Sequence, residues 1–426
     1  MFRICHKIAL DVRMCLFVLL TAICPGPVMA QDASRDSPPA DVVPAAGTLP
    51  EPMILKKVIN ASGDLVSNRE NRDDGPYVQT GQVTGAGWIS LGPGYRKQFL
   101  DVAVVDVSAA VSWRLYRAAQ ARLEIPHLAH DRLSVGAQVT YQDLLQVNYF
   151  GLGNQSQQSD RSAYRFNNLN VLGVASARPS PRLSVKARIG WVPRPDLSTA
   201  TGRALTVSNT MDKFSEISAP GITTESSFLH GDVSVAVDWR DHAGHPTHGG
   251  LYRATGAGYS DRSRTGHSFQ RVEMEASQYV PLFTRQLILA LRAWEVLSRT
   301  SSGQTIPFYM MPSLGGQNTL RGYYDYRFHD SDMQAFNAEL RWSLFTHLDA
   351  AAFADAGKVA SSVRALDFKN LRTSYGFGFR VHNAAATLVR LDVGHSGEGW
   401  HMFVKLSDAF KRSSTFSGPT VVPFVP

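Results

Sequence analysis

Two sets of residues in this sequence have types and spacing that could support catalysis or metal binding. The first, Gly394-His395-Ser396-Gly397-Glu398, resembles the G-x-S-x-G turn that presents a nucleophilic serine. Glu398 replaces the last glycine, and the stretch lies at the tip of an expected strand without the helix that follows such a turn. We therefore expect no catalytic residue here and no enzyme activity.

The second set comprises His242, His245 and His248, which lie close to Asp241 in the sequence. Imidazole and carboxylate groups are ligands of zinc, so this cluster could bind a metal ion. A polar turn explains the cluster more simply, and we expect no metal site and no cofactor. The chain also has neither a phosphate-binding loop nor a dinucleotide-binding fingerprint.

Residues 1–30 are predicted to be a cleaved secretory signal peptide. A basic start precedes a short apolar run, Cys15 to Ile23, which cannot span a bilayer. Val28-Met29-Ala30 offers a cleavage site before Gln31. All three cysteines of the chain lie in this segment, so we expect the mature protein to have no disulfide, no thiolate metal site and no cysteine nucleophile.

The composition argues against a helical membrane protein and against nucleic-acid binding. Hydrophobic residues make up 44% of the chain, yet the mean hydropathy is -0.15. After residue 30 no run approaches the ~20 apolar residues of a membrane-spanning helix. The net charge of +7 comes from basic residues scattered along the chain, which favours lumen and rim positions over a nucleic-acid surface.

From Tyr77 to Phe410 apolar and polar residues alternate with a period of two. In the segment 232–240, DVSVAVDWR, every second residue is apolar. Successive side chains of a strand point to opposite faces, so each strand has one apolar and one polar face. Soluble β-sandwiches show the same alternation, but here it persists in segments as long as a transmembrane strand.

These observations predict an all-β fold, a transmembrane antiparallel β-barrel of sixteen strands. The connections between the expected strands alternate between short links and long polar ones. Outer-membrane barrels show the same pattern of short periplasmic turns and long outer loops. The expected strands cover 76–84, 86–97, 103–115, 117–126, 132–145, 162–178, 181–194, 225–240, 250–262, 267–280, 284–299, 332–345, 347–357, 371–382, 386–396 and 400–410.

The expected organisation is a signal peptide at 1–30, a Pro/Ala-rich periplasmic linker at 31–75, the barrel at 76–410 and a polar tail at 411–426. On the last strand, alternation places Met402, Asp408 and Phe410 on the outer face, where the charged Asp408 fits poorly. The terminal aromatic Phe410 resembles the signal by which the assembly machinery recognises barrel substrates.

Several stretches resemble the BamA/TamA superfamily, the bacterial surface-antigen barrels. Leu320-Arg321-Gly322-Tyr323 lies in the long loop Ser301–Ser331, where that family carries its (L/V)RG(F/Y) motif. Glu339 and Asp355 lie on the two following strands and fall on the inner face by alternation. The resemblance implies that the loop folds into the lumen and that Arg321 meets these carboxylates. Such an Arg–carboxylate cluster narrows the lumen and braces the wall, whether or not transport occurs.

Asp238-Trp239-Arg240-Asp241, with Pro246 and Gly249, resembles the family's DxRDxxxxPxxG turn, which we expect on the periplasmic side. Family members that assemble or translocate proteins also carry periplasmic POTRA domains. Residues 31–75 are too few and too rich in proline for such a domain, so we expect a barrel that lacks POTRA domains.

The resemblance implies an outer-membrane barrel that takes part in outer-membrane protein assembly and insertion, or in secretion. The alternative is a POTRA-less channel or structural surface protein without insertase activity. A soluble periplasmic enzyme is a third interpretation, which the loop motif disfavours. The expected partners are outer-membrane lipids and the barrel-assembly machinery during biogenesis, with a separate periplasmic protein as a further candidate and no nucleic acid.

Overall fold

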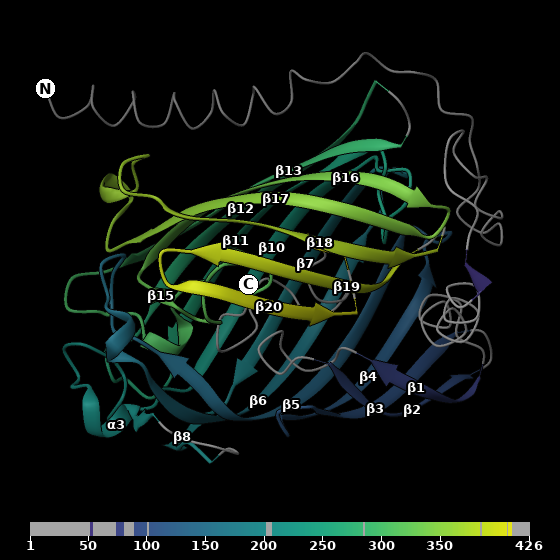
Figure 1. Ribbon diagram of the computed structural model, residues 1–426. Helices are drawn as coiled ribbons and strands as arrows, with labels where there is room; N and C mark the ends of the chain where they lie inside the picture. Colours follow the sequence, from purple (N-terminus) through teal and green to yellow (C-terminus); the bar gives the residue numbers. More distant parts are fainter. Residues whose placement is uncertain are drawn as a thin grey trace, which may run out of the picture.

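A computed structural model describes residues 52–53, 74–80, 89–99, 102–201, 207–283, 286–383, 386–406 and 408–410. Eighteen of its described strands form one large, almost entirely antiparallel sheet that curves around a lumen (Figure 1). The predicted signal peptide, the linker apart from its residues 52–53 and 74–75, and the polar tail lie outside the described residues. None of the helices within these described ranges is long and apolar enough to cross a membrane.

The N-terminal half of the wall consists of consecutive antiparallel neighbours. Its strands are β1 (Gly75–Thr80), β2 (Ser90–Phe99), β3 (Ala103–Ser112), β4 (Arg117–Leu128), β5 (Leu133–Tyr149), β6 (Ser162–Ala177) and β7 (Leu183–Val192). The long link after β7 adds three short elements beside β6, namely β8 (Asp196–Thr199), β9 (Ser208–Asn209) and α3 (Thr210–Lys213).

The C-terminal half continues the sheet, because β10 pairs with β7. Its strands are β10 (Phe228–Asp238), β11 (Gly249–Asp261), β12 (Phe269–Leu282), β13 (Leu287–Thr300), β16 (Asp332–Phe345), β17 (Leu348–Ala360), β18 (Arg372–His382), β19 (Thr387–Ser396) and β20 (Gly399–Lys405). Without the short additions β8 and β9, the eighteen strands of the described sheet leave sixteen in the wall, which confirms the prediction.

The faces of the wall are reversed relative to a soluble protein. On β10, Val233 and Val235 are 52% and 42% exposed, whereas the polar neighbours Asp232 and Ser234 are buried. Asp232 pairs with Arg188 across the inner face. An apolar outside and a polar inside are what a lipid-embedded barrel requires. The large exposed aromatics, among them Trp113, Trp191, Trp342, Tyr375 and Trp400, belong to this outer face and fit a membrane-interface belt.

The last strand is shorter than predicted, and its end turns inward. β20 ends at Lys405. Asp408 and Phe410, predicted on the outer face, are 2% and 6% exposed, so that prediction is wrong. The carboxylate of Asp408 forms an ion pair with Arg341 at 2.9 Å. Lipid offers a carboxylate no such partner, which explains why this end of the chain turns inward. The proposed assembly signal at Phe410 stays a prediction.

Each end of the sheet is a short strand. β1 has six residues and pairs with β2, and β20 has seven residues and pairs with β19. Within the described residues no ladder joins β1 to β20, so the wall has a seam between these two strands.

Candidate functional site

The loop between β13 and β16 has its own internal structure. It begins with the 3-10 helix η3 (Phe308–Met310) and forms a small antiparallel ribbon of β14 (Ser313–Leu314) and β15 (Phe328–His329). Gly315 turns the chain after β14 with a φ of +113°, where a Cβ would lie 2.2 Å from the Tyr324 carbonyl oxygen. The ribbon thus projects the segment between its strands, which carries the predicted motif.

Close backbone contact fixes the motif against β19. A Cβ on Gly322 would lie 2.7 Å from the His395 carbonyl, and one on Gly394 would lie 2.1 Å from the Arg321 oxygen. The Ser396 hydroxyl donates to the Gly322 carbonyl at 2.5 Å. The stretch that resembles a nucleophile elbow therefore seats the loop, and its Glu398 pairs with Arg327 at 2.8 Å.

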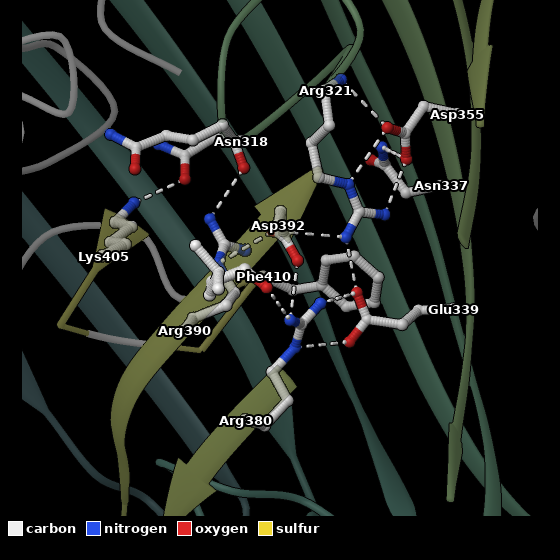
Figure 2. Close-up of polar contacts among 12 residues, drawn as sticks. Asn318, Arg321, Asn337, Glu339, Asp355, Arg380, Arg390, Asp392, Lys405 and Phe410 are labelled. Carbon is white, nitrogen blue, oxygen red and sulfur yellow. Dashed lines mark hydrogen bonds and ion pairs between the residues drawn. The ribbon is translucent and has the colours of Figure 1, made fainter. Parts of the chain in front are cut away.

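Arg321 lies between the two carboxylates on the following strands (Figure 2). Its Nη2 and Nε donate to Asp355 at 2.8 and 3.0 Å, and its Nη1 donates to Glu339 at 2.5 Å. Its backbone amide also donates to Asp355 at 3.0 Å. The guanidinium lies 3.6 Å from the centroid of the Phe353 ring. All of these contacts are buried, and charge-assisted, bidentate pairs of this kind are the strongest hydrogen bonds a side chain makes.

Glu339 is the centre of a wider network. Besides Arg321 it accepts from Arg341 at 2.8 Å and from Arg380 at 2.8 and 3.1 Å. Arg380 reaches on to Asp392 of β19 at 2.6 Å. One carboxylate on β16 thus joins the lumen loop to β18 and β19 (Figure 2). With Asp355 on β17, the loop is linked to four strands of the wall.

The arginine cluster, as we call this network, is balanced in charge. Its eight ionic members are the guanidinium groups of Arg321, Arg341, Arg380 and Arg390 and the carboxylates of Glu339, Asp355, Asp392 and Asp408. Burial of an unpaired charge costs several kcal/mol, so equal numbers of opposite charges are needed in such a place.

Sequence reasoning found three members of this cluster and missed the others. Arg380 and Asp392 lie on inward positions of their strands, but inward polar residues are common in a water-filled barrel. The only local signal was Asp408, a carboxylate on a face expected to be apolar. The seam strand is also linked to the loop, because the Lys405 ammonium donates a hydrogen bond to the Asn318 side chain.

A second contact, the aromatic anchor, holds the first part of the same loop. The fully buried Phe308 ring lies 4.9 Å from Tyr149 and 5.0 Å from Tyr164, and Tyr309 lies 5.7 Å from Phe166. Edge-to-face aromatic pairs add to the burial of apolar area. These five aromatic residues fix the first part of the loop against β5 and β6.

The predicted turn motif forms a separate unit between β10 and β11. Arg240 binds the Asp238 carboxylate with two nitrogens at 2.8 and 2.9 Å. Gly249 has a φ of +93°, and a Cβ there would lie 2.4 Å from the Trp239 carbonyl oxygen. Pro246 is buried. Each residue type of the motif thus has a structural reason within the turn itself.

Asp241 of this turn caps the loop. Its carboxylate accepts hydrogen bonds from the amides of Thr247 and His248 at 3.0 and 3.3 Å. Burial by itself raises the pKa of Asp241, but hydrogen bonds from the His248 and Thr247 side chains and the Thr247 amide outweigh burial and lower the pKa to about 2. The carboxylate therefore stays ionised in the folded protein.

Among the described residues, sixteen antiparallel wall strands, an apolar outer face and an inward loop held by a buried arginine define an outer-membrane β-barrel with a loop folded into its lumen. A family model for the Omp85 superfamily domain matches residues 104–397, which is more than half of the chain. The chain therefore belongs to the Omp85 superfamily. It is an outer-membrane barrel of that superfamily, as the resemblance to BamA and TamA predicts.

Solved structures share this fold. BamA from Haemophilus ducreyi lacking POTRA domains 1–3 is similar with a TM-score of 0.57 and 15% identity, over 79% of this chain and 69% of that chain. CdiB from Escherichia coli is similar with a TM-score of 0.51 and 12% identity, over 78% of this chain and 59% of that one, so the chain spans less than two thirds of CdiB. No curated protein matches the sequence significantly.

Proposed function

We propose that this protein inserts or secretes β-rich outer-membrane proteins through its seam, with the loop Ser301–Ser331 acting as the plug of its lumen. The observation that supports the proposal is the link from Arg321 through Glu339 and Arg380 to the strands next to the seam. A brace of this kind keeps the wall intact while its two edge strands part.

The seam strands have the properties of an acceptor site for a client strand. β1 and β20 are shorter than β2 and β19, each of which has ten residues. Unpaired backbone groups are costly in lipid, so an edge strand within the membrane favours addition of another strand. A client strand that pairs with this edge by β-augmentation satisfies those groups.

Insertion of a small unfolded outer-membrane barrel into proteoliposomes tests the proposal. The client's folding is followed by heat-modifiable migration in gels. Cysteines introduced in pairs on the outer face, at Val78 of β1 with Met402 or Val404 of β20, are designed to close the seam on oxidation. The native cysteines all lie within residues 1–30, so none competes after signal cleavage.

We expect oxidation to stop client insertion and reduction of the same sample to restore it, which makes the reduced protein its own control. Equal insertion by the oxidised and reduced protein would contradict a seam mechanism. Insertion no faster than in empty liposomes would retire the insertase role and leave secretion to be tested with a translocated client.

Single-channel recording in planar bilayers tests the plug separately. We expect small, flickering conductance in the wild type and wide openings after deletion of Ser301–Ser331. A large, steady pore in both proteins would support the alternative of an outer-membrane channel without insertase activity.

A further inference from the structure

The turn between β10 and β11 reaches across the short-turn end of the barrel. In the wall, β11 and β18 are separated by β12, β13, β16 and β17. Gly244 of the turn nevertheless forms a parallel bridge with Ala386, just before β19. The Thr387 amide donates to the Gly244 carbonyl at 3.0 Å. The turn therefore lies over the lumen mouth, which we assign to the periplasmic side because short turns face that side.

His245 of this turn is buried against two residues of the distant wall, Asp349 at the start of β17 and His382 at the end of β18. Its Nε2 lies 3.2 Å from Oδ2 of Asp349, and Nε2 of His382 lies 3.2 Å from Oδ1 of the same carboxylate. Asp349 is 0% exposed, and both histidines are buried. The neighbours His242 and His248, grouped with His245 in the sequence, are exposed.

The outer nitrogens of both rings have partners of their own. Nδ1 of His382 faces the Asn383 carbonyl at 3.4 Å, and Nδ1 of His245 faces the Thr387 hydroxyl at 3.2 Å. A carbonyl only accepts, so the proton of a neutral His382 lies on Nδ1 and its Nε2 turns a lone pair towards Asp349. Two acceptors 3.2 Å apart repel each other unless a proton or a metal ion lies between them.

We propose that His245, Asp349 and His382 bind a divalent transition-metal ion of the zinc class, which fastens the β10–β11 turn across the mouth of the barrel. Two imidazoles and one carboxylate are a donor set that zinc accepts, with the fourth position left to water. Ligand atoms around a tetrahedral zinc ion lie about 3.3 Å apart, close to the two observed separations.

The outer contacts fit the same assignment. A histidine that binds metal through one nitrogen usually donates its other N–H to an oxygen, which sets the tautomer and the ring orientation. The Asn383 carbonyl and the Thr387 hydroxyl occupy these outer positions. The two rings stack 3.6 Å apart with an interplanar angle of 9°. An ion bound by both imidazoles requires the rings to open from this parallel arrangement, so metal binding would rotate the two side chains.

The test uses the full mature chain, refolded in detergent without a histidine tag and stripped of metal with a chelator. Zinc binding is measured by titration calorimetry and elemental analysis, and cobalt serves as a spectroscopic probe because tetrahedral Co²⁺ absorbs in the visible range. We expect one ion per chain in the wild type. The double variant His245→Gln/His382→Gln is expected to lose more than about 100-fold in affinity, and Thr387→Val about 10-fold.

His242→Gln is the matched control, since His242 is an exposed histidine of the same turn. Heat-modifiable migration in gels establishes that each variant is folded before binding is measured. Retained affinity in His242→Gln, together with loss in the double variant, supports the site. Absence of zinc binding to the folded wild type, or equal affinity in wild type and double variant, overturns the proposal. Neither result bears on the insertion assay, because the metal site does not depend on the proposed function.

Discussion

One loop of this barrel is held at two places by opposite kinds of interaction. At the long-loop end, Phe308 and Tyr309 pack into aromatic rings of β5 and β6. Deeper in the lumen, Arg321 is bound by carboxylates of β16 and β17. Both contacts bury their side chains completely, but the aromatic anchor removes apolar surface from water, whereas the arginine cluster neutralises charges that burial makes costly.

Because the two anchors depend on different interactions, mutation should weaken them in different ways. An apolar contact weakens in proportion to the atoms removed, because a truncated ring leaves a cavity that water from the lumen can fill. A buried ionic cluster fails as a unit, because removal of one member leaves the opposite charges without a partner. The arginine cluster is therefore the more brittle attachment of the two and the better candidate for a point at which the loop is released.

The largest effect is expected for Arg321→Ala. This change leaves Glu339 and Asp355 buried without their shared cation, so we expect a loss of about 3–5 kcal/mol in the free energy of unfolding. Denaturant titration of the detergent-solubilised protein measures it, and single-channel conductance should rise as the loop detaches. Arg364→Ala, at an exposed arginine of another loop, is the control. Unchanged stability and conductance would show that the cluster is idle.

Phe308→Ala should have a smaller effect, about 3 kcal/mol, the lower end of the range for truncation of a buried aromatic, because it leaves no charge without a partner. The same denaturant titration measures it. Limited proteolysis of the loop is expected to report loosening at the long-loop end while the arginine cluster holds. Phe283→Ala, at a fully exposed phenylalanine, serves as the control. A larger loss for Phe308→Ala than for Arg321→Ala would reverse the comparison.

Arg321→Lys sharpens the comparison further. Lysine keeps the charge but cannot bind Asp355 with two nitrogens and reach Glu339 at the same time. We expect a loss of about 2 kcal/mol in unfolding free energy, from hydrogen bonds to charged groups, with conductance between those of wild type and Arg321→Ala. A lysine variant as unstable as the alanine variant would mean that geometry, and not charge, holds the loop.

The smallest effect is expected for Asp241→Asn, in the turn outside both anchors. The folded-state pKa of about 2 is below the ordinary value of 3.8, so the ionised carboxylate stabilises the fold at pH values above 3.8. This contribution is lost as the pH falls through about 2. The pKa difference corresponds to about 2.4 kcal/mol, but asparagine still accepts hydrogen bonds through its Oδ1. We therefore expect a deficit of about 1 kcal/mol at neutral pH that disappears below pH 2, measured by denaturant titration at each pH. A deficit independent of pH would assign the effect to packing.

The wall was predictable because its signal is local. Alternation along a strand such as 232–240 reports directly which residues face lipid, and sixteen such segments follow one another in the chain. Alternation placed Glu339 and Asp355 on the inner face, and the resemblance to the BamA/TamA superfamily implied that Arg321 meets them. The structure places the three residues in contact. The end of the last strand was predicted wrongly, because continued alternation to Phe410 does not reveal a turn into the lumen.

Partners across the lumen could not be predicted. His245 was grouped with its sequence neighbours, whereas the folded turn carries it to Asp349 and His382. Arg380 and Asp392 face inward like many polar residues, and only the register between strands decides that they meet Glu339 and each other.

The sequence by itself determined that this chain forms a β-barrel with a polar lumen and a motif-bearing loop, because lipid sorts side chains along each strand one residue at a time. Only the tertiary structure decided which buried charges neutralise one another and which turn crosses the mouth. Those choices depend on strand register and on curvature summed around the whole barrel, which no single segment encodes.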